Sequence, residues 1–172
     1  MTGSHAADAS TESVLDHRAD AVSVGGMTTT PAARTGEEFL KAIIAGEVPP
    51  PPITATLRFG LVEVGPGRAV FEGDAGEFVH NPMGTVHGGY LATLLDSALG
   101  SAVLSRLPAG SGYTTVQLNI HLVRGLTAGR LRAEAHAVHV GRTTATAEAR
   151  VIGATDGKLY AHATTTCAIL PA

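Results

Sequence analysis

The sequence predicts an α+β domain in which an antiparallel sheet of about six strands wraps around one long central helix. Three observations predict it. Residues 88–105 are small or apolar at nearly every position and are enough for about five helical turns. Two β-favourable runs precede this segment and four follow it. Because a helix that is apolar on nearly every face must be buried, we expect the strands to cover it.

The N-terminal segment, residues 1–34, is rich in Ala, Ser, Thr and Asp and has almost no large apolar side chains. Such a segment buries too little surface to offset the entropy lost on ordering, so we predict a disordered tail. Met27 is an alternative start of the native chain. We place the folded domain at residues 35–172.

The sequence lacks the patterns that are typical of export and of membrane insertion. The first residues contain no apolar core of a signal peptide, and no stretch approaches the roughly 20 apolar residues of a membrane span. The single cysteine, Cys167, cannot form an internal disulfide. We therefore expect a soluble, cytoplasmic protein without a membrane partner.

The domain is expected to begin with a short helix. Thr35 provides an N-cap, Glu37 and Glu38 make the first turn acidic, and an apolar stripe continues to Gly46. The four prolines at residues 49–52 should stop this helix and hold the chain extended.

Six β-favourable runs are read as strands. Residues 54–64 and 68–73 form a hairpin around Gly65-Pro66-Gly67. Alternation is clear in the third run, where one face carries apolar residues, and in the fifth, where alanines alternate with polar residues. The apolar face of the third run is Val116, Leu118, Ile120 and Leu122, and the alanines are Ala145, Ala147 and Ala149. The last four runs are residues 113–123, 130–140, 143–152 and 158–170.

Charge and motif content exclude several classes of function. Twelve Lys and Arg against 15 Asp and Glu give a net charge of -3, and no basic run could follow a phosphate backbone, so no nucleic-acid partner is expected. No phosphate-binding glycine loop or serine nucleophile elbow is present. Among the eight histidines, His136 and His139 should point to opposite faces of one strand, and His80 and His87 flank a turn without acidic or thiol partners. We therefore predict neither a metal nor a cofactor.

Asp96 is the only charged residue in residues 88–105. A buried, unpaired carboxylate is costly, and such groups are often functional. A structural explanation is about as well supported as a functional one at this point. Either the helix exposes one edge, or Asp96 accepts hydrogen bonds from the ends of strands. Asp96 is a candidate catalytic carboxylate on this basis.

The start of the helix is the second candidate feature. The segment Asn81-Pro82-Met83-Gly84-Thr85-Val86-His87-Gly88-Gly89 leads into the apolar run. Glycines leave backbone N–H groups open, and the helix dipole favours negative charge at this end, so an oxyanion could bind at Gly88. Structural alternatives are a tight turn at the glycines, a loop cap at Asn81 and a core histidine at His87.

The spacing of Gly88 and Asp96 carries a further inference. They are 96 − 88 = 8 residues apart, so about 12 Å separates them along one straight helix. One small carbonyl group cannot contact both. If both act on one substrate, the carboxylate must come from a second copy of the chain across a two-fold interface. The sequence therefore predicts an obligate dimer with two composite sites.

The combination N-P-x-G-x-x-H-G-G with Asp eight residues after the central glycine resembles the hotdog thioesterases of the phenylacetate-degradation (PaaI) type. The resemblance spans residues 37–170 and includes the proline-rich approach and the runs TTVQLNIHLVRG and VGRTTATAEARV. It implies a hotdog fold, hydrolysis of acyl-CoA without a metal or cofactor, and a homo-oligomer of at least two subunits, with a tetramer expected. Related hotdog enzymes carry Glu where this chain has Asp, which favours the PaaI-like branch.

The resemblance also implies roles for single residues. Gly88 would polarise the thioester carbonyl, and Asp96 from the other subunit would act as general base or nucleophile. Asn81 would orient the carbonyl or the attacking water, Thr115 would position water with Thr114 as the alternative, and His87 would support the loop. Further candidates for contacting the acyl group or the CoA phosphates are Gly89, Tyr90, Met83, Leu94, Thr114, Gly141 and Arg142.

Two other functions stay open. A hotdog hydratase or dehydratase would need a catalytic histidine beside the carboxylate. A non-catalytic acyl-CoA-binding protein would keep the fold without turnover.

Overall fold

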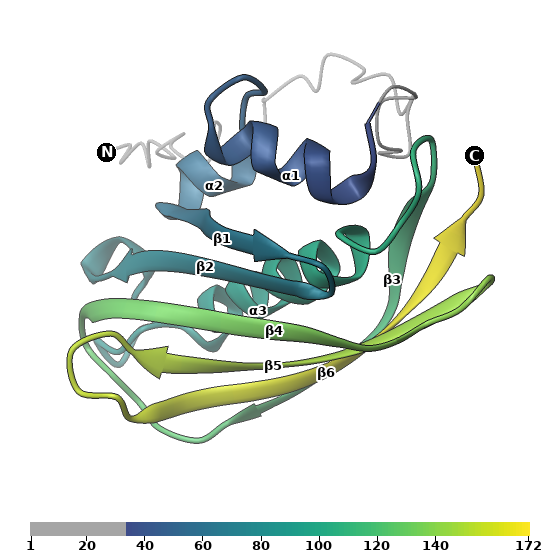
Figure 1. Ribbon diagram of the computed structural model, residues 1–172. Helices are drawn as coiled ribbons and strands as arrows, with labels where there is room; N and C mark the ends of the chain where they lie inside the picture. The colour runs from purple at the N-terminus through teal and green to yellow at the C-terminus, as the bar shows by residue number, and fades with distance from the viewer. Residues whose placement is uncertain (1–33) are drawn as a thin grey trace, which may run out of the picture.

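The computed structural model describes residues 34–172, so the predicted tail lies outside the described residues except for Arg34. The elements are α1 (Gly36–Ile44), α2 (Pro52–Leu57), β1 (Phe59–Gly65), β2 (Arg68–Ala75), the 3-10 helix η1 (Glu77–Val79), α3 (Gly88–Leu104), β3 (Gly112–Leu122), β4 (Gly129–Val140), β5 (Thr144–Gly153) and β6 (Leu159–Leu170). The strands form one antiparallel sheet in the order β1-β2-β4-β5-β6-β3. It curls around α3, while α1 and α2 lie beyond its β1 edge (Figure 1). The predicted α+β architecture is confirmed.

Helix α3 is the centre of the core. Its sheet-facing leucines are fully buried, and each contributes about 1.5–3 kcal/mol of transfer free energy. The alanines of β4, β5 and β6 face it, because small side chains let the curved sheet approach closely. The fully buried residues of α3 are Leu94, Leu95, Ala98, Leu99, Ala102 and Val103. None of the helices in residues 34–172 is long and apolar enough to cross a membrane.

Helix α1 begins as predicted. Thr35 and Glu38 form a capping box, in which each side chain accepts the other residue's backbone N–H. The Gly36 N–H also donates to the Leu107 carbonyl at 3.0 Å, and a Cβ at Gly36 would overlap the Leu104 carbonyl. Glycine at this position therefore lets α1 dock closely against the C-terminal end of α3.

The prediction that residues 54–64 form one strand is wrong in its first part. Residues Pro52–Leu57 form helix α2, and β1 starts only at Phe59. Proline is well tolerated at the first helical position, where its missing N–H is not needed. Arg58 then ends the helix in a left-handed conformation with φ of 54°. Of the four prolines, Pro52 therefore starts helix α2, while Pro51 before it is extended with φ of −57° and ψ of 141°.

Two β-bulges change the predicted faces of strands. The bulge between Thr115 and Gln117 leaves Val116 60% exposed, so Val116 does not share the half-buried face of Leu118 and Ile120. An extra residue in one strand shifts every side chain beyond it by one position.

The second bulge lies in β4. It falls between Ala137 and His139, and it places His136 opposite Glu148 and His139 opposite Thr146. Glu148 and Thr146 belong to the same outward-facing set, so the prediction that the two histidines point to opposite faces is wrong. Alternation from the sequence alone assumes an unbroken pleat, which the bulge interrupts.

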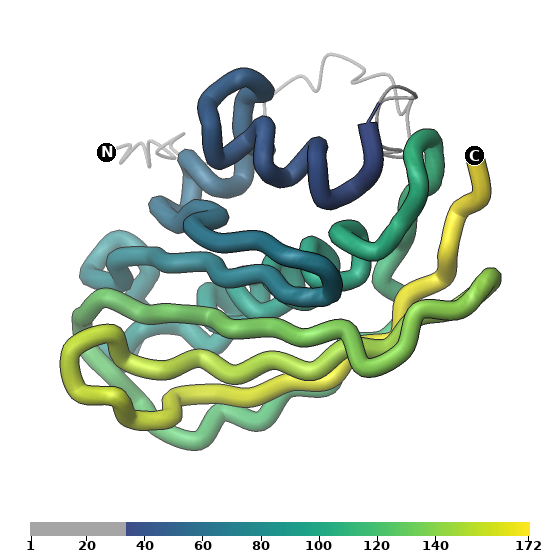
Figure 2. The backbone as a smooth tube through the Cα atoms, in the orientation of Figure 1, coloured from purple at the N-terminus to yellow at the C-terminus, as the bar shows by residue number. Residues whose placement is uncertain are grey.

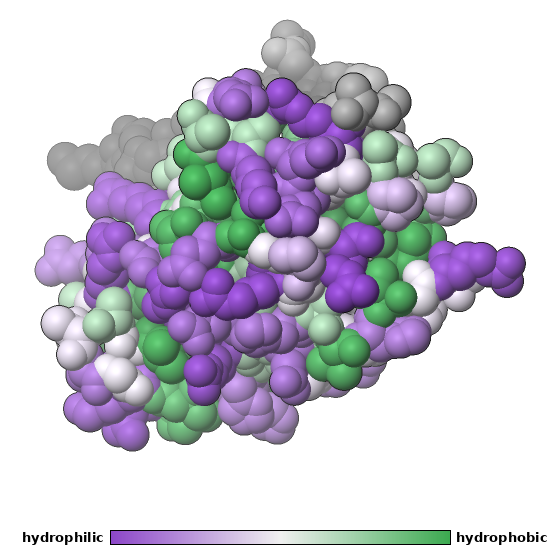
Figure 3. Space-filling model, in the orientation of Figure 1, coloured by the Kyte–Doolittle hydropathy of each residue, from purple (hydrophilic) through white to green (hydrophobic). Residues whose placement is uncertain are grey.

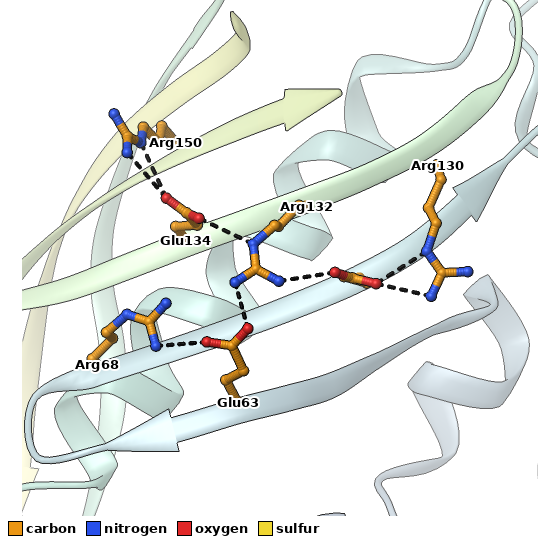
Figure 4. Close-up of polar contacts among 7 residues, drawn as sticks. Glu63, Arg68, Arg130, Arg132, Glu134 and Arg150 are labelled. Carbon is orange, nitrogen blue, oxygen red and sulfur yellow. Dashed lines mark hydrogen bonds and ion pairs between the residues drawn. The ribbon is translucent and has the colours of Figure 1, made fainter. Parts of the chain in front are cut away.

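The outer face of the sheet is mostly hydrophilic in the view of Figure 3. An ionic network lies on β1, β2, β4 and β5, and Figure 4 shows Arg132 at its centre. Arg132 contacts Glu63, Glu72 and Glu134. Its side chain is only 21% exposed, and so its contacts with Glu72 and Glu134, which are 19% and 17% exposed, are better shielded from water than ordinary surface ion pairs.

Candidate active site

The first turn of α3 is held by His87. Its Nδ1 accepts the backbone N–H of Gly89 at 2.8 Å, which makes His87 the N-cap residue. An accepting Nδ1 places the ring proton on Nε2. This contact is consistent with the supporting role that the family resemblance implies for His87.

The Gly88 N–H is open. Among residues 34–172 it donates to no acceptor, and it lies at the positive end of the helix dipole. A Cβ at Gly88 would come within 2.6 Å of a terminal methyl of Leu122, so the backbone is closely covered on that side. The geometry therefore offers an unused donor suited to a developing oxyanion.

The side chain of Asn81 makes most of its hydrogen bonds within its own loop. Its Oδ1 accepts the N–H groups of Met83 at 2.9 Å and Thr85 at 3.2 Å, and its Nδ2 donates to the Thr85 hydroxyl at 2.8 Å. One hydrogen of Nδ2 remains available. Asn81 can thus orient a substrate carbonyl by donation, while its own carbonyl oxygen is occupied.

Asp96 and Thr115 meet at the middle of α3. The Thr115 hydroxyl donates to Asp96 Oδ1 at 3.1 Å, and Asp96 is half-buried. Thr115 lies opposite the buried Cys167 and faces inward, whereas Thr114 is exposed. Of the two threonines, Thr115 is therefore the one that contacts the carboxylate.

A cavity of about 430 Å³ adjoins this carboxylate. Its polar lining residues are Asp96, Ser101, Tyr113, Thr114 and Thr115, and its apolar lining residues are Phe39, Leu40, Ile43, Pro51 and Leu104. The sequence analysis missed the contribution of α1. The apolar stripe that predicted α1 also comes from residues that line this cavity, but a stripe in the sequence does not show what the helix packs against.

A second cavity of about 260 Å³ lies beside the start of α3. Residues from α2, the η1 region and α3 line it, namely Leu57, Val79, His80, His87, Gly89, Tyr90 and Thr93. The two cavities thus lie at different points along α3. This is the arrangement expected when the oxyanion donor and the carboxylate of one chain belong to two different sites.

The predicted acyl-contacting residues do not line one common slot in this chain. Tyr90 is buried edge-on between Phe59 and Phe78, and burial raises the pKa of Tyr90 to about 12. Leu94 is fully buried in the core, and Met83 is 81% exposed. Of these three residues, only Tyr90 adjoins a cavity described above.

Gly141 and Arg142 lie in the turn between β4 and β5, which projects away from α1 and α2 (Figure 2). The Gly141 N–H closes this turn by donating to the Thr144 carbonyl at 2.9 Å. Arg142 is exposed and has no ion pair within the described part of the chain. Its predicted contact with CoA therefore stays a prediction.

Comparison with known proteins identifies the family. A crystal structure of a phenylacetic acid degradation-related protein from Ralstonia eutropha JMP134 is 31% identical, with a TM-score of 0.69, and the match covers 75% of this chain and 98% of that one. The chain belongs to the thioesterase superfamily. The sequence model of this superfamily matches residues 83–160, a segment that includes Gly88, Asp96 and Thr115. The predicted hotdog fold and PaaI-like resemblance are confirmed.

Two further relatives of this superfamily member have named functions. The phenylacetic acid degradation protein PaaI of Thermus thermophilus, solved as a variant, is 33% identical with a TM-score of 0.63; the match covers 69% of this chain and 98% of that one. A 1,4-dihydroxy-2-naphthoyl-CoA hydrolase of Listeria monocytogenes is 27% identical over 101 residues, 59% of this chain and 82% of that protein. Matches to curated relatives from Pseudomonas aeruginosa and Halobacterium salinarum span only 63% and 52% of those proteins.

Proposed function

We propose that this protein hydrolyses acyl-CoA thioesters to a free acid and CoA at sites shared between two subunits. The observation that supports this most directly is the placement of an open N–H donor and a hydrogen-bonded carboxylate at two points of one helix, Gly88 and Asp96. Acyl transfer to water needs these two elements, an oxyanion donor and a base or nucleophile. Membership of the thioesterase superfamily supports the same chemistry.

The proposed reaction begins when the thioester carbonyl accepts the Gly88 N–H. Asp96 of the partner subunit takes a proton from water, and the water oxygen forms a bond to the carbonyl carbon. The tetrahedral intermediate then expels the CoA thiolate, and the acid is released. In the alternative route, the carboxylate attacks the carbonyl carbon and displaces the CoA thiolate, and water then hydrolyses the resulting anhydride to the free acid and the carboxylate. In both routes, the Thr115 hydroxyl holds the carboxylate in position.

The surface around β3 supports the dimer. Strand β3 is an edge of the sheet, and Val116, Leu122 and Val123 are 60%, 56% and 51% exposed on or next to it. An unpaired strand edge with exposed apolar side chains favours association with a second copy. The positions of α3 that are not buried also share one side of the helix; they are Gly88, Gly89, Ala92, Thr93, Asp96 and Ser97.

A hotdog hydratase is the alternative reaction, and it needs a histidine beside the carboxylate. Within one chain Asp96 accepts a hydrogen bond from Thr115, and the Nδ1 of His87 is occupied by the Gly89 N–H. A spectroscopic assay of enoyl-CoA hydration distinguishes the two reactions.

The proposal is tested by a thiol-release assay on short, medium, long and aryl acyl-CoA, with wild type and Asp96→Asn compared. We expect Asp96→Asn to lower kcat by about a thousandfold or more, because the amide neither accepts a proton from water nor attacks a carbonyl. Circular dichroism and the melting temperature should stay near those of the wild type. Normal hydrolysis by Asp96→Asn would refute the mechanism, and binding of acyl-CoA without any turnover by wild type would favour the non-catalytic alternative.

A further inference from the structure

Residues 80–87, the oxyanion loop, lead directly into the open N–H at the start of α3. The loop is closed at its base, because His80 and Val86 form an antiparallel bridge. The backbone N–H of His87, the last residue of the loop, donates to the Val79 carbonyl at 2.8 Å. The position of the open N–H therefore depends on how this loop is held in the fold.

The connection between β3 and β4, residues 123–128, supports the oxyanion loop from outside. The Val86 N–H donates to the Leu126 carbonyl at 2.9 Å, and His80 Nε2 lies 2.6 Å from the Thr127 carbonyl oxygen. These two contacts hold the two closed ends of the loop. Of the two, only the contact of His80 is made by a side chain.

This connection is itself anchored to the sheet. The backbone N–H groups of Val123 and Arg124 donate to the Tyr160 carbonyl of β6, at 2.8 Å and 3.2 Å. Because a support is only as fixed as its own attachment, the hydrogen bonds to β6 matter for the loop as well. The oxyanion loop is thus braced against the sheet.

The contact with Thr127 also fixes the tautomer of His80. A carbonyl oxygen can only accept, so Nε2 carries a proton and donates it. The imidazole is half-buried and lines the cavity of about 260 Å³, together with His87 and Gly89. The side chain that braces the loop therefore lies beside the first turn of α3.

We infer that His80 is a positioning residue, whose imidazole N–H holds the oxyanion loop so that the Gly88 N–H meets the substrate carbonyl. This inference rests on the proposed function, because Gly88 needs exact placement only if it binds an oxyanion. Such donors act by being fixed in advance, and a displacement of about 1 Å can cost about a hundredfold in rate. His80 acts through the loop and not on the carbonyl itself.

The test replaces the imidazole by side chains that keep or lose the donor. Gln places an amide N–H near the position of Nε2, Asn is one methylene too short, and Leu has no donor. We expect His80→Leu and His80→Asn to lower kcat for acyl-CoA hydrolysis by about tenfold or more, with KM within about twofold, because the oxyanion forms only in the transition state.

Two further variants control for a general loss of structure. His80→Gln should keep kcat within about threefold of wild type, since it restores the hydrogen bond to Thr127. His136→Leu is the matched histidine control, because His136 is exposed on the outer face of the sheet and makes no hydrogen bond within the described residues. A loss that appears in KM alone, or an equal loss of kcat in His80→Gln and His80→Asn, would overturn the inference.

Amide hydrogen exchange separates this inference from the proposed function, since it needs no turnover. The N–H groups of Val86 and Gly89 should exchange about tenfold faster in His80→Leu than in wild type or His80→Gln, while residues 99–103 of α3 stay unchanged. That result supports the positioning even if no acyl-CoA is hydrolysed. Equal exchange in all three proteins, or a kcat of His80→Leu within about threefold of an active wild type, overturns the positioning and leaves the proposed function intact.

Discussion

At the scale of single residues, the contact between Asp96 and Thr115 decides how the carboxylate is presented. Asp96 stands out in the sequence as a charge in an apolar helix, but its partner does not. Thr115 is an inward-facing residue of β3, and the bulge that follows it reverses the pleat. One hydroxyl donor fixes the orientation of a carboxylate that would otherwise rotate, and such positioning is a large part of catalytic efficiency.

Removing that donor is expected to slow the chemical step. Thr115→Val keeps the shape of the side chain, and we expect kcat to fall roughly 10- to 100-fold with little change in stability. Steady-state kinetics and thermal unfolding measure the two effects. Thr164→Val, on the outward face of β6, is the control and should be near wild type. If Thr114→Val reduced kcat more than Thr115→Val, the roles of the two threonines would have to be exchanged.

At the scale of elements, charged side chains on the outer face of β4 form ion pairs with residues of β1, β2 and β5. Arg132 joins Glu63 of β1, Glu72 of β2 and its own neighbour Glu134 (Figure 4). Hydrogen bonds from Arg130 and Arg132 lower the pKa of Glu72, and hydrogen bonds from Arg132 and Arg150 lower the pKa of Glu134. A lowered carboxylate pKa contributes stability above the ordinary value of 4.5, which is lost as the pH falls through the folded-state value.

Arg132→Met should therefore destabilise the protein in a pH-dependent way. At pH 7 we expect a loss of about 1–3 kcal/mol in the free energy of unfolding, because three carboxylates lose their shared cation. At about pH 3, below the unfolded-state value of 4.5, the unfolded carboxyls take up protons and the stability from the lowered pKa values is being lost, so the effect of Arg132→Met should be smaller. Urea unfolding at both pH values gives the comparison. Arg150→Met removes a side chain that is 64% exposed and should cost less, and an equal loss from Arg132→Met at both pH values would contradict the electrostatic explanation.

At the scale of the whole molecule, the proposed chemistry requires two chains. Helix α3 is continuous from Gly88 to Leu104, so the open N–H and the carboxylate of one chain stay about two helical turns apart. No rearrangement of side chains can bring them together. A composite site therefore predicts that two different inactive chains restore each other in a mixed dimer.

Complementation tests this directly. Gly88→Pro removes the oxyanion donor at the first helical position, where proline is accepted, and His87 before it is already extended with φ of −63° and ψ of 135°. A mixed dimer of Asp96→Asn and Gly88→Pro, purified through two different tags, has one intact site of two. We expect about half of the wild-type activity per dimer. Gly88→Ala is the control that keeps the N–H, and a mixed dimer no more active than its two parents would show that each site lies within one chain.

Much of the fold could be predicted from the sequence because it depends on local patterns. The capping residues at Thr35, the glycine turn at residues 65–67 and the mostly apolar run of α3 each act over a few neighbouring residues. Helix α2 and the two bulges could not be predicted. Proline permits both a helix start and an extended chain, and a bulge arises from how two strands pair rather than from either strand alone.

By itself, the sequence determined the order of the elements and the two groups on α3 that an acyl transfer would use. Their eight-residue spacing also determined that a single chain cannot bring both to one carbonyl. Only the tertiary structure decided which threonine holds Asp96 and that α1 lines the cavity beside it. These features join residues far apart in the chain, and contacts of that kind are set by packing, which periodicity and local propensity do not encode.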